Sequence, residues 1–332
     1  MRFGFFTVCA VALFIPIAAS AQSIGGTTGG GAPSFTISVS PQYPAPNSQA
    51  SISFLSSSLD LANATVSVSV DGKKIYTGTA QPVSIPLGRG GSATSVSVDV
   101  SSGGSTYTQS VSLQPQDVSL IAEPVASAPI LYPGKPLVPI EGDVRIVAVA
   151  ALRDAGGKIY DPATLSYVWT VDGSQITNAS GIGKEALMVA SPLQYRGRSV
   201  SVVVQNQAGD LVGGAELSLS AAEPSVRIYA NDPLLGILYD HALTGAYAIT
   251  GAEADLYAAP FSFPLTGGAP SLEWFLNGAP AQSGGSLTLR PTGTGQGNAA
   301  LTLTSSAGTS AEATANLSLS FGAAQNTNLF GL

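Results

Sequence analysis

The chain has 332 residues, of which 45% are hydrophobic and 10% are charged. Soluble proteins average about 25% charged residues, so this composition argues against long helices held by surface ion pairs and favours short strands and turns. The formal net charge of −7 argues against nucleic acid as a partner, because phosphates require a basic surface. The length predicts two or three domains.

The first 21 residues have the pattern of a secretory signal peptide. Arg2 is followed by an apolar run, and Ala19-Ser20-Ala21 supplies the small residues that precede a cleavage site. We therefore expect an exported protein that begins at Gln22 and is secreted, held at the cell surface or periplasmic; an uncleaved anchor is the alternative. Cys9, the only cysteine, lies in this segment, so the mature chain would contain no disulfide. No later segment has the apolar length of a membrane span.

Residues 22–34 are rich in glycine and threonine, a composition typical of a flexible linker. Short alternating segments then follow, and the opening segment recurs three times, each copy stopped by a proline, at 35–39, 118–122 and 226–230. Each copy closes with a hairpin, and the mature chain shows no helical periodicity. These features predict an all-β fold of three tandem immunoglobulin-like β-sandwich domains. The expected bounds are 35–115, 116–222 and 223–322, with a short tail at 323–332.

A central strand ending in a tight turn also recurs in each domain. The clearest copy is 165–173, in which Tyr167 and Trp169 alternate with polar residues; the others are 271–278 and, more faintly, 65–72. Asp or Asn followed by Gly favours a hairpin, because both residues tolerate a positive φ angle. The predicted turns are Asp71-Gly72, Asp172-Gly173 and Asn277-Gly278. We expect Tyr167, Trp169 and Trp274 to be core residues of these strands; the alternative for the tryptophans is sugar stacking.

Two stretches of the second domain resemble known modules. The stretch 167–173 resembles the Tyr-x-Trp-x-x-Asp-Gly stretch of PKD-like and bacterial immunoglobulin-like domains, and 153–158 resembles the turn after the second strand of bacterial immunoglobulin-like repeats. The resemblance covers domains two and three, although the Gly-Asp-Gly of PKD domains is absent at Val171-Asp172-Gly173. It implies modules of exported surface proteins, adhesins or enzyme spacers.

The chain offers little for catalysis. His241 is the only histidine, and no Gly-x-Ser-x-Gly is present to position a nucleophile. Zinc needs three or four suitable ligands, and the turn acids Asp154, Asp161, Asp172 and Asp210 form no calcium-loop pattern. We expect no catalytic, cofactor-binding or metal-binding residue, with calcium at the turns left open.

The sequence therefore predicts a non-enzymatic exported protein of the cell envelope or extracellular space that acts in binding, adhesion or spacing. The alternatives are a structural subunit of an appendage or layer that pairs through edge strands, and a hydrolase with an unrecognised site. Expected partners are a protein or polysaccharide at the cell surface, or further copies of the chain. We expect the binding surface on turns and edge strands, in the irregular segments 125–141 and 231–250, which carry Tyr132, Tyr239 and Tyr247, and in the loop 281–297.

Overall fold

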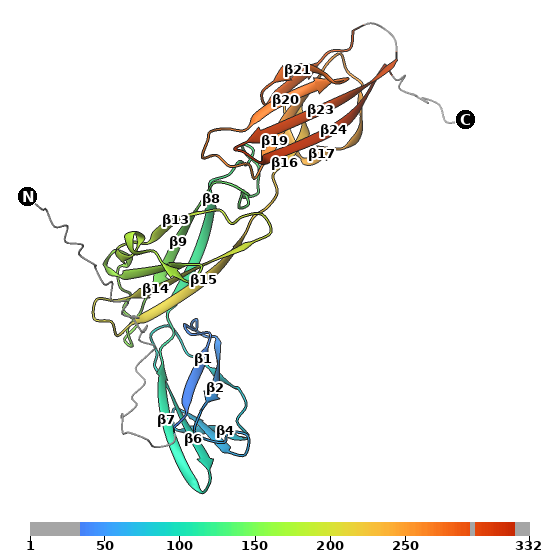
Figure 1. Cartoon of the computed structure of the whole chain (residues 1–332). Coiled ribbons are helices and arrows are strands. Elements are labelled where there is room, and N and C mark those ends of the chain that lie inside the picture. The colour runs from blue at the N-terminus through green and yellow to red at the C-terminus, as the bar shows by residue number, and fades with distance from the viewer. Residues whose placement is uncertain (1–33, 293–295, 323–332) are drawn as a thin grey trace, which may run out of the picture. The chain divides into compact units, whose positions relative to one another are not determined.

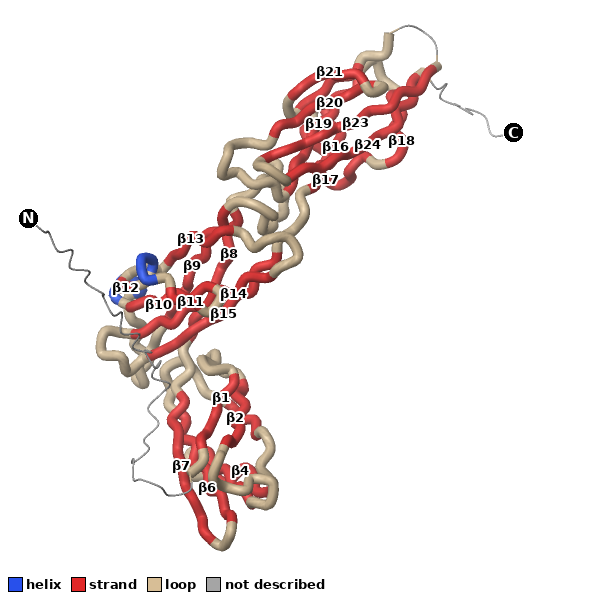
Figure 2. The backbone as a smooth tube through the Cα atoms, in the orientation of Figure 1, coloured by secondary structure: helices blue, strands red, loops and turns tan. Residues whose placement is uncertain are grey.

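The computed structural model describes residues 34–292 and 296–322. The predicted signal peptide, nearly all of the predicted linker and the tail at 323–332 lie outside the described residues. The described part is mainly β-structure, with two short 3-10 helices at Pro162–Thr164 and Thr177–Ala179 (Figure 1, Figure 2). The all-β prediction is confirmed, and the strands form three tandem sandwiches. None of the helices in this part of the chain is long and apolar enough to cross a membrane.

Sandwich 1 occupies residues 34–115 and consists of two sheets. Its strands are β1 (Thr36–Ser40), β2 (Gln49–Leu55), β3 (Thr65–Val70), β4 (Lys73–Gly78), β5 (Val83–Pro86), β6 (Thr94–Ser102) and β7 (Ser105–Leu113). The two sheets have the orders β1-β2-β5 and β4-β3-β6-β7. Alternation on the strands buries mainly valine and isoleucine, such as Val66, Val68 and Ile52. This core has no tryptophan, since both tryptophans lie in the later sandwiches.

Sandwich 2 repeats this plan. Its strands are β8 (Asp117–Pro124), β9 (Asp143–Ala151), β10 (Ser166–Val171), β11 (Ser174–Gln175), β12 (Gly181–Ile182), β13 (Ala186–Ala190), β14 (Gly197–Gln205) and β15 (Val212–Ser220). One sheet has the order β13-β9-β8, and the other has the order β11-β10-β14-β15, with β12 also paired to β10. The central strand of the prediction is β10, which lies between β11 and β14.

Sandwich 3 adds two strands to the plan. Its strands are β16 (Ser225–Asp232), β17 (Gly236–Leu243), β18 (Gly245–Ile249), β19 (Ala254–Phe261), β20 (Ser271–Leu276), β21 (Ala279–Ser283), β22 (Ser286–Leu289), β23 (Gly297–Ala307) and β24 (Ala311–Phe321). The sheets have the orders β17-β16-β19-β22 and β18-β24-β23-β20-β21. The chain thus crosses from one sheet to the other between β17 and β18, and β18 pairs in parallel with β24.

The prediction that 231–250 is irregular is wrong, because this segment contains all of β17 and β18. The corresponding segment of sandwich 2, residues 125–141, forms no strand. Four prolines interrupt it, and proline donates no N–H to a strand ladder, whereas residues 234–259 contain no proline. The similarity between Ile130-Leu131-Tyr132 and Ile237-Leu238-Tyr239 therefore does not extend to the backbone: the first lies in a turn and the second in a strand.

Each sandwich has its own hydrophobic core. By its contacts, however, the chain divides into two compact units, one built on sandwich 1 and the other on sandwiches 2 and 3. Sandwiches 2 and 3 form one unit because segments on either side of their junction bond to each other, as described below.

Candidate functional site

The residues predicted to fill the cores are fully buried. Tyr167, Trp169 and Trp274 each have a relative exposure of 0%. The indole N–H of Trp169 donates to the carbonyl of Lys184 at 2.8 Å, and that of Trp274 donates to the carbonyl of Gly284 at 2.9 Å. Burial raises the pKa of Tyr167 to about 12, with smaller contributions from nearby carboxylates. Sugar stacking requires an exposed ring face, so the arrangement places both tryptophans in structural roles.

The predicted turn residues share one hydrogen-bonding arrangement in all three sandwiches. Asp71, Asp172 and Asn277 have φ angles of 49°, 49° and 54°, and the glycines that follow, Gly72, Gly173 and Gly278, also have positive φ angles. In each turn the backbone N–H donates to the carbonyl of one residue on the neighbouring strand, and Oδ1 accepts from the N–H of that same residue. The six distances lie between 2.8 and 3.0 Å, and the partners are Ser95, Ser199 and Ala300.

This arrangement, which we call the Asx clamp, fixes the central hairpin of each sandwich to the next strand of its sheet. Asp and Asn both supply the oxygen, which explains why the turns tolerate either residue. Asp172 also contacts Arg198, with Oδ2 3.1 Å from Nε. The sequence predicts the turns but not the clamp, because the partner residue is 23 to 27 positions away.

The junction between sandwiches 2 and 3 contains a short antiparallel pairing. Ser127 N donates to the carbonyl of Phe263 at 2.8 Å, and Ser262 N donates to the carbonyl of Ser127 at 2.9 Å. The side chain of Ser127, which is 6% exposed, also accepts from Phe263 N at 3.0 Å. Leu265 N continues the pairing by donating to the carbonyl of Val125. Part of the predicted binding segment 125–141 is therefore bonded to sandwich 3.

Tyr132 and Tyr239, which belong to the segments predicted to carry the binding surface, also lie at this junction. The ring of Tyr132 packs edge-on against Tyr239 and Phe261, with ring centroids 5.6 and 4.9 Å apart. The Tyr239 hydroxyl donates to the carbonyl of Ile130 at 2.7 Å, and burial raises the pKa of Tyr239 to about 12. Tyr229 packs against Tyr239 and is 4% exposed. The contacts of Tyr132 with Tyr239 and Phe261 join the two sandwiches.

A carboxylate also bonds across the junction. Glu141, just before β9, accepts from Thr309 N at 3.0 Å, from Thr309 Oγ1 at 2.7 Å and from the hydroxyl of Ser310. These hydrogen bonds stabilise the ionised form and lower the pKa of Glu141 from about 4.5 to about 2. Sequence reasoning missed Glu141, because its partners lie 168 and 169 positions later in the turn between β23 and β24.

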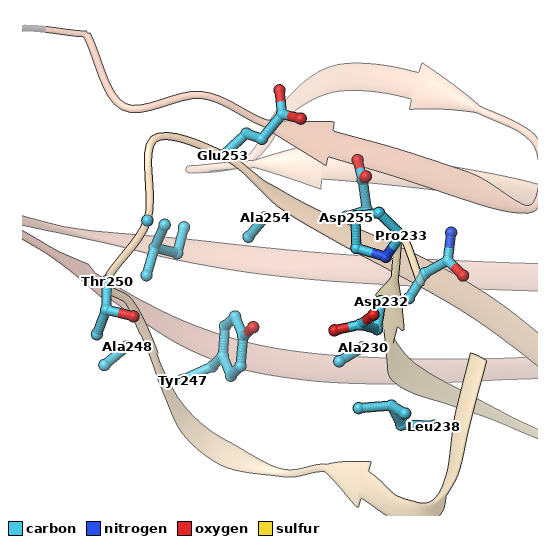
Figure 3. Close-up of a pocket in the computed structure, with 13 residues that line it drawn as sticks. Ala230, Asp232, Pro233, Leu238, Tyr247, Ala248, Thr250, Glu253, Ala254 and Asp255 are labelled. Carbon is cyan, nitrogen blue, oxygen red and sulfur yellow. The ribbon is translucent and has the colours of Figure 1, made fainter. Parts of the chain in front are cut away.

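Tyr247, the third tyrosine of the predicted binding segments, lies in the wall of a pocket in sandwich 3. The pocket has a volume of about 340 Å³ and lies where the chain crosses between the sheets, bounded by the β16–β17 turn, β18 and the start of β19. Figure 3 shows Asp232 and Tyr247 pointing toward one another across it. Its polar lining residues are Asn231, Asp232, Tyr247, Thr250, Glu253 and Asp255.

The acids of this pocket are already bonded within the protein. Asp232 Oδ1 accepts from Leu235 N and Leu234 N, and these bonds lower the pKa of Asp232. Glu253 lies 2.8 Å from Nε of Arg290, and Asp255 accepts from Thr288 Oγ1. The carboxylates therefore hold the hairpin and the strands in place.

The other residues considered for catalysis or metal binding do not converge. His241 lies exposed on β17, outside the residues that line the pocket. Of the turn acids, Asp161 accepts from Ala163 N, and Asp210 accepts from Asn206 Nδ2 at 2.6 Å. Within the described residues, no group of three or more His, Cys, Asp or Glu side chains is placed to hold a metal ion. The third predicted binding segment, 281–297, contains the end of β21 and all of β22, and its residues 293–295 lie outside the described residues.

Comparison with known proteins identifies no family for this chain. No family model matches it, and no curated protein matches it. Solved structures of tandem modules align along most of its length. They include three N-terminal domains of the outer capsid protein Hoc of bacteriophage RB49, at 13% identity, covering 87% of this chain and 99% of that one, with a TM-score of 0.24. The central fibronectin-III array of RIM-binding protein aligns at 12% identity, covering 85% and 93%, with a TM-score of 0.28.

Immunoglobulin domains 1–4 of Sidekick-1 align at 13% identity, covering 87% of this chain and 74% of that one, with a TM-score of 0.21. The likeness to immunoglobulin-like modules is one of fold. It rests on the strand orders and cores of this chain, since the overlays have low TM-scores.

Proposed function

We propose that this chain is a non-enzymatic exported protein of the cell envelope or extracellular space. In this proposal its tandem immunoglobulin-like modules act as spacers and carry a binding surface. The observation that carries this proposal is the junction between sandwiches 2 and 3. Backbone pairing at Ser127, packing of Tyr132 on Tyr239 and the Glu141 hydrogen bonds all cross it. Modules joined only by a linker move independently, whereas these contacts favour a fixed spacing.

The binding surface in this proposal is the end of sandwich 3 that carries the pocket. Tyr247 lines this pocket, and Leu234 and Leu235 on the adjoining turn are 94% and 77% exposed. Exposed apolar side chains beside a polar hollow favour contact with a partner surface. The partner class is a protein or polysaccharide at the cell surface, and the acidity of the chain disfavours nucleic acid.

Export is supported by the signal-peptide pattern of residues 1–21. A non-enzymatic role is supported by the placement of His241 away from the pocket and by the internal bonding of the pocket acids. We expect incubation with panels of polysaccharides and peptides to give no cleavage. Turnover in such a panel would favour the hydrolase alternative.

The spacing role is tested by the distance between sandwiches 2 and 3 in solution. Spin labels at Ser174→Cys and Thr314→Cys, both exposed positions, report this distance by pulsed electron resonance, in a chain whose Cys9 is removed with residues 1–21. We expect a narrow distance distribution, which Glu141→Ala combined with Tyr239→Ala broadens. A wild-type distribution as broad as that of the double variant would contradict the spacing role.

A specific observation also favours the second candidate function, a subunit of a surface assembly that pairs through edge strands. One edge strand of sandwich 1 is long, regular and uncharged, and its hydrogen-bonding register specifies how it could pair with the same strand of a second copy.

A further inference from the structure

The edge in question is strand β7, the last strand in the order β4-β3-β6-β7 (Figure 1). It pairs with β6 without a register shift from Ser105 to Leu113. Its nine residues include no charge, proline or glycine. An edge of this kind presents a row of backbone N–H and C=O groups that can pair with another strand.

The other long edges of the described sheets carry features that oppose strand addition. The opposite edge of the same sheet, β4, begins with Lys73 and Lys74 and has a register shift against β3. In sandwich 2, β15 contains Gly213, Gly214 and Glu216, and β8 contains charged residues and ends at Pro124. The edges without such features, β1, β13 and β22, have only four or five residues.

Sandwich 3 shows that this position in the fold accepts a strand. Its last strand, β24, corresponds to β7 and is covered by β18, which pairs with it in parallel from Leu317 to Phe321. Among the strands that the structure describes, none covers β7 in this way. The same edge is thus closed within the chain in one sandwich and left open in another.

The register of the β6–β7 hairpin determines which groups of β7 face outward. Ser102 and Ser105 close a two-residue turn at Gly103-Gly104 and form a hydrogen-bonded pair. Because hydrogen-bonded pairs alternate with non-bonded pairs, every second residue from Ser105 bonds to β6. The residues between them direct their backbone N–H and C=O groups away from β6, and their side chains are exposed: Thr106, Thr108, Ser110 and Ser112.

We propose that two copies of this chain associate by antiparallel pairing of β7 with β7 of the second copy, about a two-fold axis at Gln109. In this register Thr106 faces Ser112 of the second copy, and Thr108 faces Ser110. Every outward backbone group then meets an outward group, and each such pair exchanges two hydrogen bonds. The two sheets become one continuous sheet across the axis.

The composition of β7 favours a second copy of this chain as the partner that supplies the pairing strand. The pairing is isologous, so one surface supplies both halves of the contact. Threonine and serine face each other on the exposed side, and such pairs stabilise adjacent strands. The strand carries no charge, so no charge repulsion arises at the contact itself. The repulsion between two chains of net charge −7 comes from residues outside β7. Salt screens that repulsion, and we expect tighter association at about 0.15 M than at about 0.01 M salt. This inference goes beyond the proposed function, since it holds whether or not the chain is exported.

The proposal is tested by analytical ultracentrifugation of the full chain without residues 1–21. The molecular mass is measured over a series of concentrations. We expect a monomer–dimer equilibrium. Ser110→Lys should raise the dissociation constant at least about tenfold, because a lysine ammonium opposes strand addition at an edge. Ser51→Lys adds the same charge at an exposed position on the central strand β2 and should leave the equilibrium unchanged. Matching urea midpoints for both variants would show that folding is intact.

The register is tested separately by cross-linking. Gln109→Cys places two thiols opposite each other at the axis, in a non-hydrogen-bonded pair whose Cβ atoms are close enough for a disulfide. We expect a covalent dimer from Gln109→Cys and much less from Thr77→Cys on the opposite edge strand β4. A monomer up to about 1 mM, which is the range of negligible affinity, would overturn the proposal. A dimer that Ser110→Lys leaves unchanged, or equal cross-linking at the two edges, would also overturn it.

Discussion

Substitutions at Asn277 can separate the two contributions of the Asx clamp to stability. Asn277 Oδ1 accepts from Ala300 N at 2.8 Å, and the residue has a φ angle of 54°. Asn277→Gly removes the hydrogen bond but tolerates the backbone angle, so it should destabilise sandwich 3 by about 1 kcal/mol. Asn277→Ala also removes the bond, and it keeps a Cβ in the left-handed region without the local hydrogen bonding by which asparagine tolerates that conformation, so it should destabilise by about 2 kcal/mol. Asn277→Asp keeps an acceptor oxygen and should be close to neutral.

Urea unfolding followed by tryptophan emission measures these differences. In a Trp169→Phe background, Trp274 is the only tryptophan and reports on sandwich 3, whose core contains it. Thr314→Ala, at an exposed position on β24, is the matched control and should shift the unfolding free energy by less than about 0.5 kcal/mol. The clamp reasoning fails if Ala is no worse than Gly, or if Asp is as damaging as Ala.

Three further predictions concern other parts of the chain. Trp169→Ala should destabilise sandwich 2 by about 3–5 kcal/mol, and wild-type emission should be blue-shifted; solvent-like emission would contradict the burial. Because the pKa of Glu141 is lowered to about 2 on folding, its contribution is complete above about pH 4.5 and is lost as the pH falls toward 2; Glu141→Gln should therefore lower the Tm at pH 6 but little at pH 2. The intact mass of exported material should correspond to a chain beginning at Gln22, and a mass that retains Met1 would favour an anchor.

Local patterns were sufficient to predict the central strand of each sandwich and the turn that follows it. Alternation around Tyr167 and Trp169 specifies which face of β10 is buried, and Asp172-Gly173 specifies the turn that follows. These features depend on neighbours in sequence, which is why they can be read from one chain. The same holds for the turn at Asn277-Gly278.

The junction and the pocket could not be predicted in this way, because their residues meet only after folding. Glu141 meets Thr309, and Ser127 meets Phe263, across separations of 168 and 136 residues. The strands β17 and β18 were missed because the residues around Tyr132 and Tyr239 are alike, which suggested the same irregular structure for both segments. The signal that distinguishes them is proline: residues 125–141 contain four, and residues 234–259 contain none.

The parallel pairing of β18 with β24 has a consequence for the order in which the chain folds during its synthesis. Residues 245–249 can pair only after residues 317–321 have been made. The hydrogen bonds of Glu141 likewise form only after Thr309 and Ser310 have been made. All pairings of sandwich 1, by contrast, lie within residues 36–113. Since synthesis from the N-terminus delivers these segments in sequence, sandwich 1 can mature while sandwich 3 is still incomplete. The arrival of the last hairpin then completes sandwich 3 and its junction with sandwich 2 together.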